Sequence, residues 1–132
     1  MMPSRNLSAI AVLCLVLAGC ATLDPGQDPV AVRAEQTTVI AFDVLDTFVN
    51  WERTNEFLVG PDVNRFADEI RRQAPVWLTA ARELTKTYKA NRTPANKANL
   101  LTALAVLETA MSQAQRVMAN STNSNLKLNP YT

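Results

Sequence analysis

The stretch that decides the fold is VIAFDVLDTFVNW, residues 39–51, in which apolar residues recur every three or four positions. Ala41, Val44, Phe48 and Trp51 follow one another at steps of three, four and three. Residues at this spacing lie on one face of an α-helix, whereas a half-buried strand alternates at every second position. The stretch therefore predicts an amphipathic helix with one buried face.

The same spacing extends beyond this stretch and recurs in two later segments. The first segment carries Val30, Ala34, Thr37, Ala41, Val44, Phe48, Trp51, Asn55 and Leu58; the second Val63, Ala67, Ile70, Ala74, Trp77, Ala81, Leu84 and Tyr88; the third Leu100, Leu104, Leu107, Met111, Ala114 and Met118. Three such faces joined by short turns are typical of a helical bundle. The sequence predicts an all-α chain, an antiparallel three-helix bundle over residues 29–120.

Prolines mark the expected helix boundaries. Asp28-Pro29 and Thr93-Pro94 each place an N-cap residue before a proline at the first helical position. Gly60-Pro61 is a stop signal. The predicted helices are 29–58, 62–91 and 94–120. Pro75 falls inside the second, where it removes a backbone donor and crowds the preceding turn, so a kink or break is expected near 72–75. A static bend is favoured over a functional hinge.

The apolar face of the first helix is wider than two neighbouring helices need. Off the main seam it also carries Val39, Ile40, Phe42, Leu45 and Val49. One explanation is that this helix is the most buried of the three, with Asp43 and Asp46 on its solvent side. The other is that Phe42 and Val49, seven residues apart, face a second copy or a partner helix.

The first twenty residues have the three parts of an export leader. Arg5 supplies a basic start, residues 7–18 form a short apolar run, and small residues precede Cys20. Twelve helical residues span roughly 18 Å, too short for a bilayer core of roughly 30 Å. A transmembrane helix is therefore not favoured here.

Leu17-Ala18-Gly19-Cys20 resembles the lipobox of bacterial lipoproteins. The resemblance implies that residues 1–19 are a signal peptide, removed on export, and that the thiol of Cys20 carries a diacylglyceryl group, with a further acyl chain such as palmitate on the new amino group. Two or three acyl chains anchor a protein stably in a membrane. Ala21 stands where an aspartate tends to retain such proteins in the inner membrane, so the resemblance implies the periplasmic face of the outer membrane, with the inner membrane as the weaker alternative.

Composition limits what the remaining 113 residues, 132 minus 19, can do. They form one domain preceded by a lipidated tether, residues 20–28. Cys14 leaves with the leader and Cys20 is lipidated, so no disulfide is expected within the mature chain. Its 12 basic and 12 acidic side chains balance, which argues against a nucleic-acid partner.

The chain contains no histidine, so it lacks the commonest general base and metal ligand. Asp43, Asp46, Glu52 and Glu56 are interpreted as a solvated acidic face and not as a metal site. We expect no catalytic residues, no metal and no cofactor. Trp51, Trp77 and Tyr88 are expected in the core and not in a sugar-binding platform.

Four basic residues surround the second predicted turn: Lys86, Lys89, Arg92 and Lys97. In an antiparallel bundle this turn lies at the same end as the start of the first helix and therefore near the anchor. The cluster is interpreted as facing anionic headgroups. Ordinary solvation of helix ends, with cations favoured at a C-terminus, explains it equally well.

Residues 121–132 are polar and are predicted to form a flexible tail.

Together these features predict a non-catalytic lipoprotein, held in the membrane through Cys20, that acts as an interaction or scaffolding module for itself or for an envelope protein. A carrier or inhibitor of a small ligand, with the Pro75 kink opening an apolar pocket between Trp77 and the third helix, is one alternative. A lysis accessory encoded by a phage is another.

Overall fold

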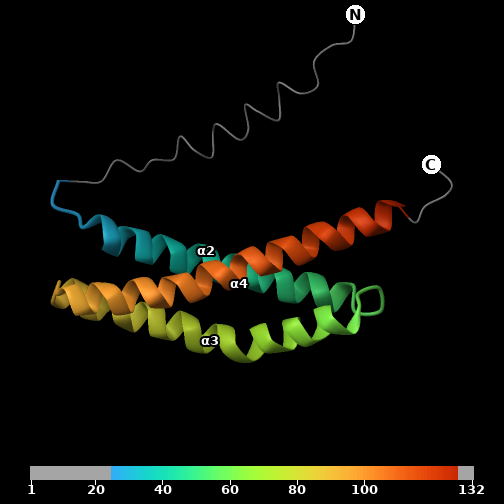
Figure 1. Ribbon diagram of the computed structural model, residues 1–132, viewed down its shortest axis with the longest axis horizontal. Helices are drawn as coiled ribbons and strands as arrows, with labels where there is room; N and C mark the ends of the chain where they lie inside the picture. The colour runs from blue at the N-terminus through green and yellow to red at the C-terminus, as the bar shows by residue number, and fades with distance from the viewer. Residues whose placement is uncertain (1–24, 128–132) are drawn as a thin grey trace, which may run out of the picture.

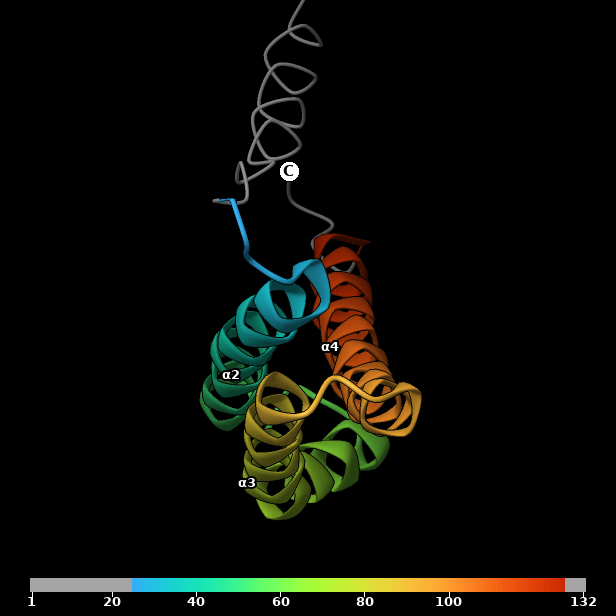
Figure 2. The ribbon, with the colours of Figure 1, turned by 90° about the vertical axis from the view of Figure 1, so that its left-hand side faces the viewer.

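The computed structural model describes residues 25–127, and these fold into three helices: α2 (Pro29–Thr54), α3 (Pro61–Ala90) and α4 (Pro94–Lys127). Each helix packs against the other two (Figure 1). Viewed from one end, the helices occupy the three corners of a triangle (Figure 2). No strand occurs in residues 25–127, so the prediction of an all-α chain with three packed helices is confirmed. The signal peptide, Cys20 and the lipobox lie outside the described residues.

The helices begin where the proline signals indicate. Asp28 caps α2, because its side chain accepts hydrogen bonds from the backbone N–H groups of Val30, at 2.9 Å, and Ala31, at 3.0 Å. The Thr93 hydroxyl accepts one from the N–H of Asn96 at 3.2 Å, at the start of α4. A side-chain oxygen thus satisfies N–H groups that the first helical turn leaves unpaired.

Two helix ends differ from the predicted ones by more than one residue. α2 ends at Thr54 and not at residue 58, because Asn55 leaves the helical conformation and its side chain donates a 2.7 Å hydrogen bond to the carbonyl of Trp51. α4 continues to Lys127 and so takes in the first part of the predicted tail. No glycine or proline interrupts the chain between Pro94 and Pro130, so no strong breaker ends the helix at 120. The predicted tail beyond 127 lies outside the described residues.

The core lies along the axis between the three helices. Its largest fully buried side chains are Leu45, Phe48, Ile70, Leu100, Leu104 and Leu107. Phe48 is central, because its ring lies 6.0 Å from that of Trp51 and 5.1 Å from that of Phe66, measured between ring centroids. Buried threonines satisfy their own hydroxyls, as Thr38 and Thr85 donate to the carbonyl four residues earlier. The hydroxyl groups of Thr38 and Thr85 are therefore paired within the core.

The buried face drifts by one residue from the predicted seam. Leu45 and Leu78 are buried, whereas their neighbours Val44 and Trp77 are half-buried. Later in α3, Thr85 is buried and Leu84 is half-buried. A helix of 3.6 residues per turn moves by about 20° per heptad against a strict 3.5-residue repeat. A buried face predicted with the 3.5-residue period is therefore displaced by one residue along part of the helix.

Pro75 does not interrupt α3, which is one continuous helix from Pro61 to Ala90. Its ribbon is bowed in the middle, on the side away from α2 (Figure 1). Pro75 itself is exposed at the surface. Pro75 also lines a groove between α2 and α3.

Candidate ligand groove and charged pole

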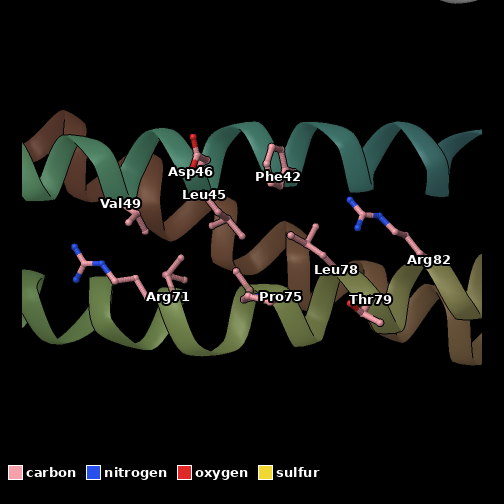
Figure 3. Close-up of a pocket in the computed structure, with 11 residues that line it drawn as sticks. Phe42, Leu45, Asp46, Val49, Arg71, Pro75, Leu78, Thr79 and Arg82 are labelled. Atoms are coloured by element: carbon pink, nitrogen blue, oxygen red, sulfur yellow. The ribbon is translucent and has the colours of Figure 1, made fainter.

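The structure brings Phe42 and Val49, the predicted partner face, to one groove between α2 and α3. The groove has a volume of about 360 Å³. Its lining residues are Phe42, Leu45, Asp46, Val49, Ile70, Arg71, Ala74, Pro75, Leu78, Thr79 and Arg82. Figure 3 shows Leu45 and Val49 extending from α2 toward α3, with Pro75 facing them. The predicted face is therefore the α2 side of a two-helix groove.

An ion-paired cluster centred on Arg71 lies at one end of this groove. Arg71 binds the carboxylate of Glu52 and also that of Asp68, the latter at 2.7 Å. The pKa of Arg71 is raised: burial lowers it, but the hydrogen bonds to Glu52 and Asp68 and their negative charges outweigh that effect. The cluster ties the C-terminal part of α2 to the first half of α3.

The placement of Glu52 on a solvated acidic face was wrong. Glu52 is 3% exposed, and its carboxylate forms an ion pair with the guanidinium of Arg71. Glu52 follows Phe48 by four residues and so shares its buried face. A charged residue can occupy such a position when an opposite charge and hydrogen bonds compensate for burial. By contrast, Asp43, Asp46 and Glu56 are exposed, as expected.

Arg82 lies at the other end of the groove, and its side chain extends toward α2 (Figure 3). It makes no hydrogen bond or ion pair with any residue in the described part of the chain. The groove therefore has a compensated cation at one end and an uncompensated one at the other. Neither arginine stood out in the sequence, although Arg71, Pro75 and Arg82 follow one another at helical spacing on one face of α3.

Three of the four predicted membrane-facing cations have acidic partners. Lys86 lies 2.8 Å from Glu83, and Lys89 lies 2.8 Å from Glu35 on α2. Arg92 lies 3.8 Å from Asp28. No ion pair is found for the fourth, Lys97, within residues 25–127. The cluster exists as a group of residues around the second turn, but most of its charge is locally balanced.

Asp28 joins the start of α2 to the end of α3. Its carboxylate accepts a 3.1 Å hydrogen bond from the Tyr88 hydroxyl, besides capping α2. The backbone N–H of Ala31 is the main cause of a lowered pKa at Asp28; burial opposes this effect, and Tyr88, Val30 and Arg92 add to it. Burial, followed by the bond to the Asp28 carboxylate, raises the pKa of Tyr88. The two side chains favour an ionised Asp28 beside a protonated Tyr88.

A second hollow lies between α3 and α4, beside Trp77. Phe66, Trp77, Val106 and Ala110 are among its lining residues, and its volume is about 450 Å³. The small-ligand alternative placed a pocket here and attributed its opening to Pro75. Pro75 instead lines the groove on the α2 side of α3, so Pro75 and the Trp77 hollow belong to different surfaces.

The loop between α2 and α3 carries two largely exposed apolar residues, Phe57 and Leu58.

Within residues 25–127, no group of three or more acidic, cysteine or histidine side chains is close enough to hold a metal ion. None of the helices in that range has the length and apolar character needed to cross a bilayer. Comparison of the chain with protein-family models, with curated proteins and with solved structures gave no match.

Proposed function

We propose that this chain is a non-catalytic bacterial lipoprotein, anchored through Cys20 to the periplasmic face of the outer membrane, whose helical bundle is an interaction or scaffolding module. The observation that carries the proposal is Leu17-Ala18-Gly19-Cys20, preceded by Arg5 and an apolar run too short to span a bilayer. On this proposal, residues 1–19 are a cleaved signal peptide and residues 20–28 a short lipidated tether.

The bundle is proposed to be antiparallel, with the second turn facing the membrane. The contacts between Asp28 and Tyr88 and between Glu35 and Lys89 support this, because each joins the start of α2 to the end of α3. The tether from Cys20 leads to Asp28 and spans at most about 26 Å at roughly 3.3 Å per residue. The anchor therefore holds this end of the bundle close to the leaflet.

The acyl anchor, more than the basic cluster, is proposed to supply the membrane affinity. A basic residue near an anionic surface contributes about 1 kcal/mol, but the partners of Lys86, Lys89 and Arg92 compensate that charge. Each buried CH₂ of an acyl chain contributes about 0.8 kcal/mol. We expect Lys97 to be the member of the cluster whose charge is most available to headgroups.

The bow of α3 is attributed to Pro75, as a static feature. A proline inside a helix lacks the N–H for one backbone hydrogen bond and its ring crowds the carbonyl four residues earlier, which bends the helix. The partner surface is then the side of the bundle that holds Phe42, half-exposed on α2, with Val49 beside it. Either a second copy or another envelope protein is compatible with this surface.

Metabolic labelling with an alkyne analogue of palmitate tests the anchoring. The full-length chain, expressed in a Gram-negative host, should carry the label and sediment with the outer membrane. Cys20→Ser should lose the label, whereas Cys14→Ser is the matched control and should keep it. Equal labelling of wild type and Cys20→Ser would overturn the proposal.

A further inference from the structure

The groove between α2 and α3 combines an apolar floor with a single uncompensated cation. Leu45, Ile70 and Leu78 form part of the floor and are buried against the core, while Val49 and Pro75 line it from the two helices. Arg82 lies at one end without an acidic partner in residues 25–127. This combination suits a ligand that has an apolar body and one anionic end.

The other charges around the groove fix the direction of such a ligand. At the far end, Glu52 and Asp68 already occupy the guanidinium of Arg71. Asp46 on the α2 side accepts a 3.0 Å hydrogen bond from Asn50 and extends away from α3 (Figure 3). The ligand is therefore expected to place its anionic head at the Arg82 end and its apolar body toward Pro75 and Val49.

The dimensions of the groove suit a ligand with a single alkyl chain. Arg71 and Arg82 are eleven residues apart on α3, about 16 Å at 1.5 Å per residue. The groove offers about 360 Å³, which is within the lower part of the range for small-molecule sites, roughly 300–1,000 Å³.

We propose that this groove binds an amphiphile with one alkyl chain and an anionic head group, its head at Arg82 and its chain along Phe42, Val49 and Pro75. A fatty-acid carboxylate and the phosphate of a single-chain lipid share this chemistry. The proposal does not depend on lipidation at Cys20, because every residue that carries it lies in the bundle. Anchoring through Cys20 and ligand binding in the groove therefore fail or succeed independently.

Photo-crosslinking tests the inference on the full-length chain in membranes. Three probes share a dodecyl chain with a diazirine at its far end and differ only in the head: carboxylate, alcohol or trimethylammonium. A fourth probe has a phosphate head, so that a phosphate can be compared with a carboxylate as the anionic group. We expect the anionic probes to label peptides that contain residues 42–49 and 75–79, more strongly than the alcohol and far more strongly than the ammonium probe.

Two variants and a control sharpen the test. Arg82→Gln should weaken labelling by the anionic probes by about fivefold, the effect of one partly exposed ion pair, and leave the alcohol unchanged. Arg72→Gln removes another exposed cation of α3 that does not line the groove, and should change nothing. Thr79→Trp, at an exposed lining position, should fill the groove and block the anionic and alcohol probes, with circular dichroism and thermal melting verifying the fold.

Equal labelling by the anionic and ammonium probes would overturn the proposal, because it would show a non-selective apolar surface. Crosslinks confined to peptides outside residues 42–49 and 71–82 would overturn it as well. Labelling that is insensitive to both Arg82→Gln and Thr79→Trp would have the same consequence. Labelling by one anionic head and not by the other would support the groove and identify the source of the anion.

Discussion

Among single residues, Glu52 shows how a charge can be placed inside a small bundle. Its side chain is 4% exposed, and Arg71, whose side chain is 31% exposed, supplies the opposite charge. Removing one partner of a buried pair leaves an uncompensated charge, which costs more than the pair contributes. The pair therefore makes the stability of the bundle depend strongly on Arg71.

We predict that Arg71→Met lowers the free energy of unfolding by about 3 kcal/mol, measured by urea denaturation. The double variant Glu52→Met/Arg71→Met should recover most of the loss, because both charges are then absent. Arg65→Met is the control: Arg65 pairs with Asp62 at the surface, where both side chains are largely exposed, and such pairs contribute under about 1 kcal/mol. Equal effects of Arg71→Met and Arg65→Met would contradict the assignment.

Asp28 predicts a specific pH dependence. Because its pKa is lowered in the folded chain, its contribution is present above the unfolded value of about 3.9 and is lost as the pH falls through the folded value. Asp28→Asn keeps a good N-cap residue but does not titrate. The Tm difference between wild type and Asp28→Asn should therefore be positive near neutral pH and shrink below about pH 4. A difference that stays constant from pH 7 to pH 2 would refute this.

At the scale of helices, the sequence predicts starts better than ends and faces. Proline after an N-cap residue marks the starts of α2 and α4 at Pro29 and Pro94. These starts are predictable because the capping side chain and the proline are neighbours in the sequence. The end of α2 depended on the side chain of Asn55 bonding back to the helix. The one-residue drift to Leu45 and Leu78 reflects how helices wind against one another, which the 3.5-residue count does not contain.

The groove was only half visible in the sequence. Phe42 and Val49 stood out because apolar residues off the main seam need an explanation. Their partners on α3 lie about 30 residues later, and nothing local relates Phe42 to Arg82. Only the packing of α2 against α3 brings these residues to one surface.

We predict that Pro75→Ala straightens α3 and stabilises the bundle by about 1–3 kcal/mol, because an N–H then becomes available to the carbonyl of Arg71. Thermal melting measures the gain. Pro61→Ala is the control, since Pro61 occupies the first turn of α3, where proline removes no helical hydrogen bond. A Pro75→Ala chain that melts below wild type would contradict a bend imposed by proline, and an unchanged groove in its crystal structure would do the same.

For the whole molecule, stability rests on one narrow core. Phe48 is fully buried at its centre, so Phe48→Ala should lower the free energy of unfolding by about 3–5 kcal/mol, a large part of the 5–15 kcal/mol typical of small domains. Phe57, 97% exposed at the first turn, is the matched control, and Phe57→Ala should leave the unfolding curve unchanged. Comparable losses in both variants would show that the first turn is covered in solution.

The central claim is that the bundle is tethered to the membrane by a lipidated Cys20. Intact-mass and N-terminal peptide analysis of the full-length chain, extracted from the membranes of a Gram-negative host, tests it most directly. The account predicts a chain that begins at Cys20 and carries the mass of a diacylglyceryl group and an amide-linked acyl chain. A chain that retains Met1, begins at another residue, or carries an unmodified Cys20 would contradict it.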